Sequence, residues 1–426
     1  MTNREIVEKL RTLIKQMEAK DGISPKDSYS PDLGGLSKGY EQVFYENLDV
    51  RTTVETYCGF TVYTTSYNMG CFPLFYPVDW ETVLFLLEGK SSFGTNPRDN
   101  PDNLLFLDVE TTGMLGAGTV CFLIGLGRWK DGGFEVLQYF LSDRDKEPLM
   151  LEHMLAHILD GTILVTFNGK CFDVPLLTNR FIMNGLHVDS LATNVLGHID
   201  LYSLVRKLGR HPVYGYSLQE SAARFVGTTR SDDISGHLIP ALYFIYEQDQ
   251  DISVLERVFT HNRLDVLDMV GLLRALGRIY LEGPEVCDDP FTLSGVGRFY
   301  LRKGNVGGAK EYMLAAEDQF AVGGIRGRAS EANMRQVATL LRKEGNWADA
   351  ATIWKDLIQQ DAAIAEDYLW LARYYELVEA DIETSIQLVE QGITWCTKNQ
   401  KRVPDALMSR KRRLEKLLSK KGRPRE

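Results

Sequence analysis

An apolar run leads directly into two closely spaced acids in the stretch LLFLDVETTG, residues 104–113. Side chains at positions i and i+2 of a strand point to the same side of a sheet, so Asp108 and Glu110 would leave a buried strand together. Two like charges held side by side are costly unless something positive lies between them. A divalent metal with oxygen ligands is the simplest such group. The alternative is a strand that runs out into a polar turn, with both acids solvated.

The segments after this strand follow a regular order. Two strand-like runs, TVCFLIGLGRW and FEVLQYFL, are joined by the turn KDGG, and such short connections predict an antiparallel meander. A helix over about 146–159, a strand over 162–167, a helix opened by CFDVP and a strand in HIDLYSLV come next. Three sequential strands followed by alternating helix and strand predict a mixed α/β sheet.

Two further segments carry side chains that could complete a metal site. Asp173 follows a strand that ends at Asn168, although an aspartate in this place could equally be the N-cap of the next helix. His261 and Asp265 are four residues apart in a helix predicted over about 252–281, so they share a helix face. A surface ion pair is the alternative there. Asp200, in HIDL, is interpreted as a structural or outer residue.

Taken in order, these signals resemble the DEDD class of RNase H-like 3′→5′ exonucleases. The motifs LLFLDVETTG, GAGTVCFLIGLGRW, LVTFNGKCFDVPLL, HIDL, DDISG and HNRLDVLDM are closer still to the bacterial YprB-type family, whose RNase H-like proteins often carry tetratricopeptide repeats. The resemblance covers about residues 104–283. It implies an RNase H-like fold and hydrolysis of nucleic-acid phosphodiesters.

The resemblance also implies a set of site residues. Asp108, Glu110, Asp173 and Asp265 would hold two divalent cations, Mg²⁺ or Mn²⁺, both of which suit carboxylate ligands. Two such ions can activate a water and stabilise the leaving oxygen. His261 would be the general base, because imidazole titrates near neutrality.

His261 departs from the pattern of the class. Enzymes of this kind that use a histidine place it five residues before the last aspartate, whereas those that use a tyrosine place it four before. His261 has the tyrosine-like spacing to Asp265, a difference of about 100° around a helix. The metal ligands are therefore better supported than the base. Four further residues are expected to line the substrate cleft: Thr111, Asn168, Lys170 and Phe172.

Composition limits the protein class and its compartment. A chain that is 44% hydrophobic and 25% charged is typical of a globular protein. No apolar run approaches the ~18–20 residues that span a membrane, and the first 20 residues predict an amphipathic helix rather than a signal peptide. The six cysteines are scattered, without a CxxC pair. We expect a cytoplasmic protein without membrane contact.

Charge is unevenly distributed along the chain. Residues 398–426 contain 12 Lys/Arg and 3 Asp/Glu, a net of +9, so the remainder of the chain carries −10 − 9 = −19. A basic end on an acidic body can contact nucleic acid. A solvated terminal helix is the alternative.

The last third of the chain predicts paired helices. Gly304-Asn305 and Gly345-Asn346 are 41 residues apart, and Asn346 and Asp381 are 35 apart. This spacing resembles degenerate tetratricopeptide repeats, whose period is ~34 residues. An ordinary helical bundle is the alternative. A groove formed by such repeats would bind a peptide or a partner protein.

Together these features predict four parts and an enzyme. The parts are an N-terminal region of open role (1–100), an RNase H-like exonuclease domain (101–283), helical repeats (290–397) and a basic tail (398–426). The expected activity is a metal-dependent hydrolase acting on single-stranded nucleic-acid ends. A non-catalytic scaffold with the same fold, or an endonuclease using the same metals, remains open, as does the choice between DNA and RNA.

Overall fold

The computed structural model describes residues 3–21, 50–68, 80–87, 103–113, 116, 118–158, 161–186, 195–209, 211–228, 230 and 233–421. The chain divides into two compact units, Met1–Asp288 and Asp289–Glu426. The loop predicted over residues 22–40 lies outside the described residues. The limits of the four predicted parts remain predictions.

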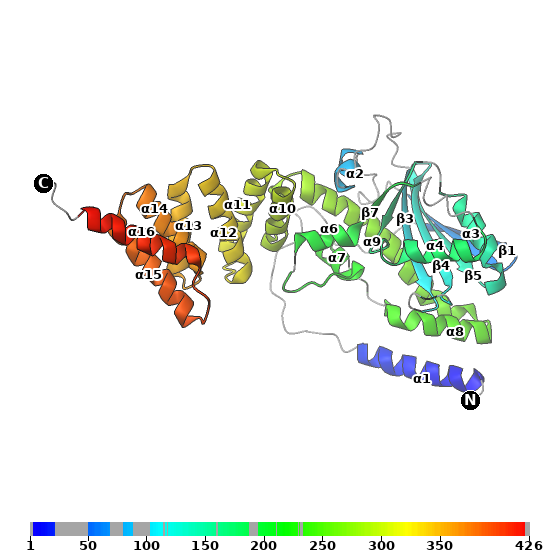
Figure 1. Cartoon of the computed structure of the whole chain (residues 1–426). Coiled ribbons are helices and arrows are strands. Elements are labelled where there is room, and N and C mark those ends of the chain that lie inside the picture. The colour runs from blue at the N-terminus through cyan, green and yellow to red at the C-terminus, as the bar shows by residue number, and fades with distance from the viewer. Residues whose placement is uncertain are drawn as a thin grey trace. The chain divides into compact units, whose positions relative to one another are not determined.

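The described strands of the first unit form one mixed seven-stranded sheet, in the order β1-β2-β5-β4-β3-β6-β7 (Figure 1). Neighbouring strands are antiparallel from β1 to β3, whereas β3, β6 and β7 are parallel. The predicted mixed α/β sheet is therefore confirmed. The strands are β1 (Val50–Tyr57), β2 (Phe60–Asn68), β3 (Leu104–Thr111), β4 (Cys121–Lys130), β5 (Gly133–Leu141), β6 (Thr162–Thr166) and β7 (Val195–Asp200).

The meander of β3, β4 and β5 is confirmed, and its second turn shows why. Asp131 and Gly132 both have positive φ, 51° and 76°, as the central residues of a tight type I′ hairpin turn require. β2 then pairs with β5 on the far side. Segments that precede residue 101 thus extend the same sheet as the acid-bearing strand.

The described helices of the first unit pack on this sheet or on one another. They are α1 (Asn3–Asp21), α2 (Trp80–Leu86), α3 (Glu147–Leu155), α4 (Asp173–Met183), α6 (Leu201–Leu208), α7 (Leu218–Phe225), α8 (Ile239–Asp249) and α9 (Glu256–Leu281), with a 3-10 turn, η7 (Ile252–Leu255), before α9. The predicted strand HIDLYSLV is only half correct, because β7 ends at Asp200 and LYSLV begins α6. Leu201, Leu204, Val205 and Leu208 are buried at helical spacing, which favours the helix.

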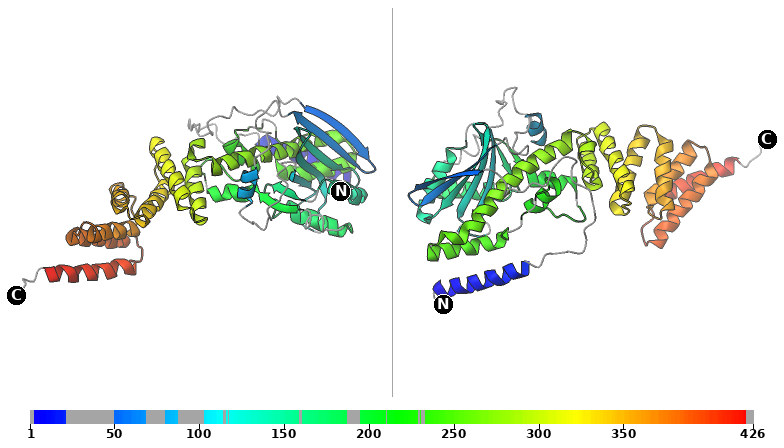
Figure 2. Two further views of the ribbon diagram at one scale, coloured as in Figure 1. Left: turned by 90° about the horizontal axis from the view of Figure 1, so that it is seen from above. Right: turned by 180° about the vertical axis from the view of Figure 1, so that it is seen from behind.

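The two faces of β3 pack against different helices. Leu105 and Leu107 belong to a core cluster that also contains residues of α3, α4 and α8. The alternate residues of the strand face α9, which runs across the sheet (Figure 2). A Cβ atom at Gly127 of β4 would lie 2.5 Å from Val266 of α9, so the glycine permits this close packing. Asp108 and Glu110 consequently point toward α9.

The second unit is all-helical in its described part and contains successive helix pairs. The N-caps of α11, α13 and α15 are Asn305, Asn346 and Asp381, and each side chain accepts a hydrogen bond from the backbone N–H three residues later. The small residues four positions after these caps are fully buried: Ala309, Ala350 and Ser385. The helices are α10 (Pro290–Arg302), α11 (Val306–Val322), α12 (Arg328–Lys343), α13 (Trp347–Gln359), α14 (Ala365–Leu377), α15 (Ile382–Lys398) and α16 (Asp405–Lys421). Within the described ranges of both units, no helix has the length and apolarity that a bilayer-spanning segment needs.

Candidate active site

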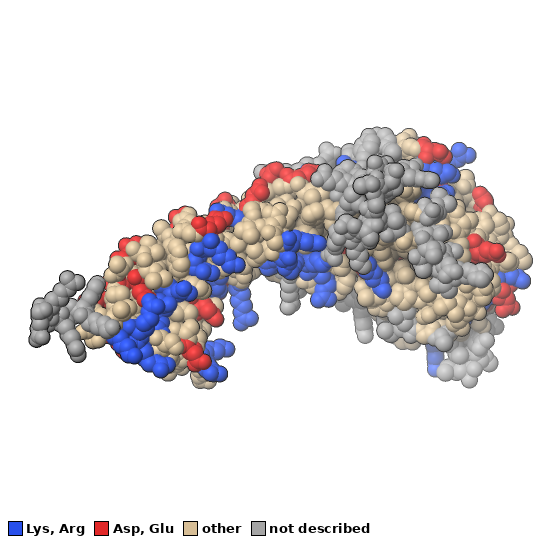
Figure 3. All heavy atoms as spheres, turned by 45° about the horizontal axis from the view of Figure 1, so that its top comes forward, with Lys and Arg blue, Asp and Glu red and all other residues tan. Residues whose placement is uncertain are grey.

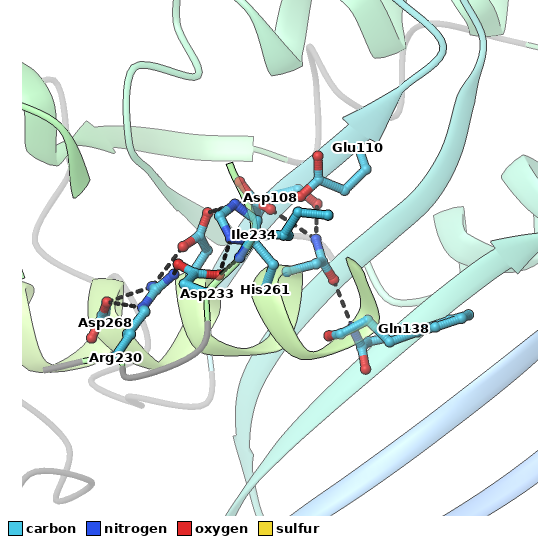
Figure 4. A network of polar contacts seen from close by, with 11 residues as sticks. Asp108, Glu110, Gln138, Arg230, Asp233, Ile234, His261 and Asp268 are labelled. Carbon is cyan, nitrogen blue, oxygen red and sulfur yellow. Dashed lines mark hydrogen bonds and ion pairs between the residues drawn. The ribbon is translucent and has the colours of Figure 1, made fainter. Parts of the chain in front are cut away.

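Asp108 and Glu110 lie near the carboxyl end of β3, opposite Gly125 and Leu123 of β4. The pairing register shifts between Glu110 and Thr111, so an irregularity in the ladder follows directly after the two acids. Both side chains project toward α9 (Figure 4). The predicted placement of the acid pair on one face of the strand is confirmed.

A buried amide chain holds the Asp108 carboxylate. Nδ2 of Asn262 donates a hydrogen bond to Oδ2 of Asp108 at 2.8 Å. Nε2 of Gln138 donates in turn to Oδ1 of Asn262 at 2.9 Å and to the carbonyl oxygen of Phe259 at 2.8 Å. Asn262 is completely buried, and Gln138 nearly so. Gln138 therefore fixes which way the Asn262 amide points, and Asn262 fixes Asp108.

Gly125 provides the space for this amide chain. A Cβ atom at this position would lie 2.5 Å from Oδ1 of Asn262 and 2.9 Å from its Nδ2. Any larger residue at position 125 would displace the Asn262 side chain, and with it the donor to Asp108.

Asp173 is brought to the site by the parallel part of the sheet. The carboxyl ends of β3 and β6 meet at one edge, and the chain passes from β6 through a short turn into α4. Asp173 is the first residue of α4, and Phe172 occupies the N-cap position without a side-chain cap bond. The alternative interpretation of Asp173 as an N-cap is therefore wrong, because the turn places it one residue inside the helix.

Asp200 secures the turn before Asp173. Its carboxylate accepts hydrogen bonds from the backbone N–H groups of Asn168, at 2.9 Å, and Lys170, at 3.3 Å. Asn168 has φ of 66°, in the left-handed region that asparagine tolerates. The buried Asp200, at the end of β7, thus holds the turn between β6 and α4, in agreement with its predicted structural role.

His261 faces the acids despite its unusual spacing. Its Nδ1 lies 2.6 Å from Oδ1 of Asp233, and its Nε2 lies 3.4 Å from Oδ2 of Asp265 and 4.0 Å from Oε1 of Glu110 (Figure 4). A carboxylate can only accept, so Nδ1 carries the proton and Nε2 faces Glu110 and Asp265. The side chains of Glu110, Asp265 and His261 keep 13%, 15% and 16% of their surface exposed, so solvent reaches them.

Arg230 lies between three aspartates beside this histidine. Its Nη1 donates to Asp233 at 2.8 Å, its Nη2 donates to Asp265 at 2.6 Å, and its Nε donates to Asp268 at 3.1 Å. Sequence reasoning did not assign a role to Arg230, Asp233, Asn262 or Gln138. The only signals were two motifs of the resemblance, DDISG, which contains Asp233, and HNRLDVLDM, which contains Asn262.

The pKa values of Asp108, Glu110 and Asp173 are raised by burial and by neighbouring negative charges. Burial raises the pKa of Asp108 well above its ordinary value, and the charges of Asp265, Glu110 and Asp173 add to the effect. Burial likewise raises the pKa of Glu110 to about 8, against the opposing charge of His261. It raises the pKa of Asp173 to about 7. These carboxylates are therefore close enough to repel one another, although they come from β3, α4 and α9.

His261 balances part of this negative charge, with Asp233 as its partner. Burial alone would lower the pKa of His261, but Asp265, the bond to Asp233 and the charge of Glu110 outweigh it and raise that pKa to about 9. The pKa of Asp233 is lowered to about 2, because His261 and Arg230 outweigh the effect of its burial. At neutral pH the imidazole is thus held in its protonated form by the surrounding carboxylates.

The predicted substrate residues differ in their surroundings. Lys170 is exposed, and Phe172 keeps 49% of its surface exposed, so both are accessible beside Asp173. Asn168 is partly buried in the turn held by Asp200. Thr111 donates its hydroxyl to the carbonyl oxygen of Gly113 at 2.7 Å, which closes the turn after β3.

The donor chemistry of the cluster fits hard cations, since four carboxylates with mutual repulsion would gain from Mg²⁺ or Mn²⁺. The described side chains are not already gathered at ligand distances, however. Among them, no group of three or more His, Cys, Asp or Glu is arranged to hold one ion. Asp265 is instead paired with Arg230.

Comparisons with known proteins agree with this architecture. A model of the RNase_H superfamily matches residues 105–277, from β3 to the part of α9 beyond Asp265. The chain contains an RNase H-like domain. With the seven-stranded sheet and the helices that follow it, the predicted fold class is confirmed.

Two individual proteins resemble the chain. The Bacillus subtilis (strain 168) protein named "Uncharacterized protein YprB" is 27% identical over 303 residues, or 69% of this chain and 70% of that protein. The family B DNA polymerase of the archaeon Pyrobaculum calidifontis is 19% identical with a TM-score of 0.34, a likeness too low to establish a common fold. It covers 52% of this chain, which spans only 29% of the polymerase chain.

Proposed function

We propose that the RNase H-like domain is a metal-dependent nuclease of the DEDD class, which removes nucleotides from the 3′ end of a nucleic-acid strand. One observation carries the proposal. The charge of Asp265 raises the pKa values of Asp108, Glu110 and Asp173, so these carboxylates lie close together. His261 lies beside Glu110 and Asp265. Perturbed carboxylates gathered with a histidine on an RNase H-like sheet support a catalytic role.

The four carboxylates would hold two Mg²⁺ or Mn²⁺ ions. When bound, such ions activate a water and stabilise the leaving oxygen. The chain itself must release protons to receive them, because carboxylates with raised pKa values bind cations only after deprotonation. The Gln138–Asn262 amide chain would keep the Asp108 carboxylate oriented while this exchange takes place.

His261 would act as the general base through Nε2. Asp233 accepts the Nδ1–H and so fixes the tautomer whose Nε2 lone pair is directed toward the acids. The raised pKa of His261 depends on the charge of the nearby carboxylates, so neutralisation of that charge would lower it toward neutrality. The bond to Asp233 compensates for the tyrosine-like spacing, because it positions the ring from outside α9.

The turn before Asp173 would contact the 3′ end of the nucleic-acid substrate. Lys170 presents an ammonium for a phosphate, and Phe172 presents an exposed ring on which a base can stack. Thr111 and Asn168 lie in turns on either side of the acids. Their backbone geometry would shape the cleft, and single-stranded DNA or RNA would be the substrate.

The C-terminal helices would form tetratricopeptide-like repeats. Equivalent N-caps at Asn305, Asn346 and Asp381 support this assignment. The similarity to the Bacillus protein supports membership of the YprB-type family. These helices would bind a protein partner, and the predicted basic tail would contact nucleic acid. The protein would be located in the cytoplasm.

A non-catalytic scaffold is the second candidate, and Arg230 favours it. The guanidinium pairs with Asp265 at 2.6 Å and would have to give up this carboxylate before a cation could use it. If that exchange does not take place, the domain would bind nucleic acid without cleaving it.

A cleavage assay separates these functions. The full chain would be incubated with 5′-labelled single-stranded DNA or RNA and with Mn²⁺, Mg²⁺ or EDTA. A metal-dependent ladder that shortens from the 3′ end supports the exonuclease, and internal cuts support an endonuclease. Binding without cleavage under all metal conditions would favour the scaffold.

A further inference from the structure

Two arginines lie against one tryptophan in the C-terminal unit. The guanidinium of Arg342, on α12, is 3.9 Å from the ring centre of Trp370, and that of Arg373 is 4.5 Å from the same centre. Trp370 and Arg373 both belong to α14. The ring of Trp354, on α13, stacks near Trp370 with a centroid separation of 6.4 Å. The indole therefore holds both guanidiniums in place.

These two arginines have no carboxylate partner among the described residues, unlike Arg335 and Arg410 of the same unit. Arg335 pairs with Asp367, and Arg410 pairs with Glu376. The Nε atoms of Arg342 and Arg373 are buried without a hydrogen-bond partner within the described part of the unit. Two unneutralised cations held this close repel each other, so a bound anion would stabilise them.

The positive charge continues across alternate helices. The charge of Arg373 acts on both Arg342 and Arg410 of α16, and Arg410 is also paired with Glu376. Arg373 thus lies within electrostatic range of cations on α12 and α16. Figure 3 shows Lys and Arg side chains gathered near the C-terminal end of this unit. Several neighbouring cations match repeated negative charges better than they match a single carboxylate.

We propose that Arg342, Arg373 and Trp370, here called the arginine–tryptophan surface, bind the phosphodiester backbone of a single-stranded nucleic acid. A guanidinium stacked on an indole can still present the N–H groups of its terminal nitrogens to phosphate oxygens. Trp370 would orient both guanidinium groups through cation–π contacts with its ring. The choice of nucleic acid over another polyanion rests on the proposed nuclease function.

Fluorescence anisotropy with the full-length protein tests this surface. The probe is a fluorescein-labelled oligo-dT or oligo-rU of about 20 nucleotides, a length that spans one or more binding sites. EDTA prevents cleavage, so the result does not depend on the metal site. The test variant is Arg342→Gln/Arg373→Gln. The matched control is Arg326→Gln/Arg328→Gln, which removes the same charge from exposed positions of the same unit.

The test variant should bind about tenfold more weakly, and the slope of log K against log salt should fall by about 1.4, because each phosphate contact on a single strand contributes about 0.7. Arg342→Lys/Arg373→Lys should keep most of the slope, and circular dichroism verifies that each variant is folded. An unchanged slope in the folded glutamine variant would overturn the proposal. So would an arginine-dependent interaction with an oligo-glutamate probe but not with either oligonucleotide.

This outcome is independent of the nuclease proposal. If the glutamine variant binds the oligonucleotides as well as the wild type does, and the wild type cleaves short strands normally, the surface alone is refuted. Arginine-dependent binding without any cleavage would support the surface and refute the nuclease.

Discussion

His261 and Asp233 are joined through Nδ1 and Oδ1 at 2.6 Å, although 28 residues separate them in the chain. The aspartate is in turn bonded to Arg230 and to the backbone N–H of Ile234. Asp233 is therefore fixed before it contacts the imidazole. This contact explains how a histidine with tyrosine-like spacing can still face the acids of the sheet.

Asp233→Asn should lower the pKa of His261 from about 9, because the variant removes a charge and a hydrogen bond that favour the imidazolium. We expect an NMR titration of the His261 ring to shift to lower pH. The cleavage rate should fall by at least about tenfold, since a positioned base contributes about 10²–10⁴-fold. Asp145→Asn, on an exposed turn, is the matched control. A His261 titration that does not move would contradict the assigned contact.

Glu110→Gln should reduce the pH dependence of stability in EDTA. The folded state raises the pKa of Glu110 from 4.5 to about 8, so it retains a proton that the unfolded chain releases. The free energy of unfolding then falls as pH rises from about 4.5 through about 8. Denaturant titrations between these limits should show this fall in the wild type and a smaller one in Glu110→Gln. The exposed Glu152→Gln should behave like the wild type, and equal slopes for all three proteins would reject the repulsion in the cluster.

Gly125→Ala should destabilise the domain by about 1–3 kcal/mol, because its methyl group would displace Asn262 from the amide chain. Asn262→Ala should also destabilise it, since Gln138 and Asp108 lose a buried partner. The double variant should be more stable than the sum of the two effects predicts, by more than about 0.5 kcal/mol. Gly118→Ala, where an added Cβ contacts nothing, is the control. Strict additivity in denaturant titrations would show that the two side chains do not compete for space.

Removal of residues 290–426 should leave the hydrolysis of short oligonucleotides largely unchanged, because all proposed ligands lie in the first unit. Longer strands should bind more weakly, since the arginine–tryptophan surface is lost. Initial rates on strands of about 5 and about 20 nucleotides measure both effects. Complete loss of activity on both strands in a folded truncation would contradict a separable catalytic unit.

The acid pair and the sheet could be predicted because their signals are local. An apolar run ending in Asp108 and Glu110 shows both the strand and the face on which the acids lie. His261 and Asp265 share a helix face for a similarly local reason. Tertiary packing brought these pieces together as the ordered motifs had suggested.

The supporting residues could not be predicted because their partners are distant in sequence. Gln138 contacts Asn262 across 124 residues, and Asn262 contacts Asp108 across 154. In the sequence, each of these amides resembles an ordinary polar residue of a strand or a helix. Only the closure of α9 over β3, β4 and β5 buries them and makes their hydrogen bonds obligatory.

Cleavage of a 5′-labelled single strand in Mn²⁺ by the wild type and by Asp108→Asn is the most direct test. The control is Asp131→Asn, in a hairpin turn that asparagine fits well. The proposal predicts a 3′-shortening ladder for the wild type and the control, and a loss of at least about 100-fold for Asp108→Asn, because the variant removes a central cation ligand. Equal cleavage by all three proteins, or none by the folded wild type, would contradict the assignment of these carboxylates to catalysis.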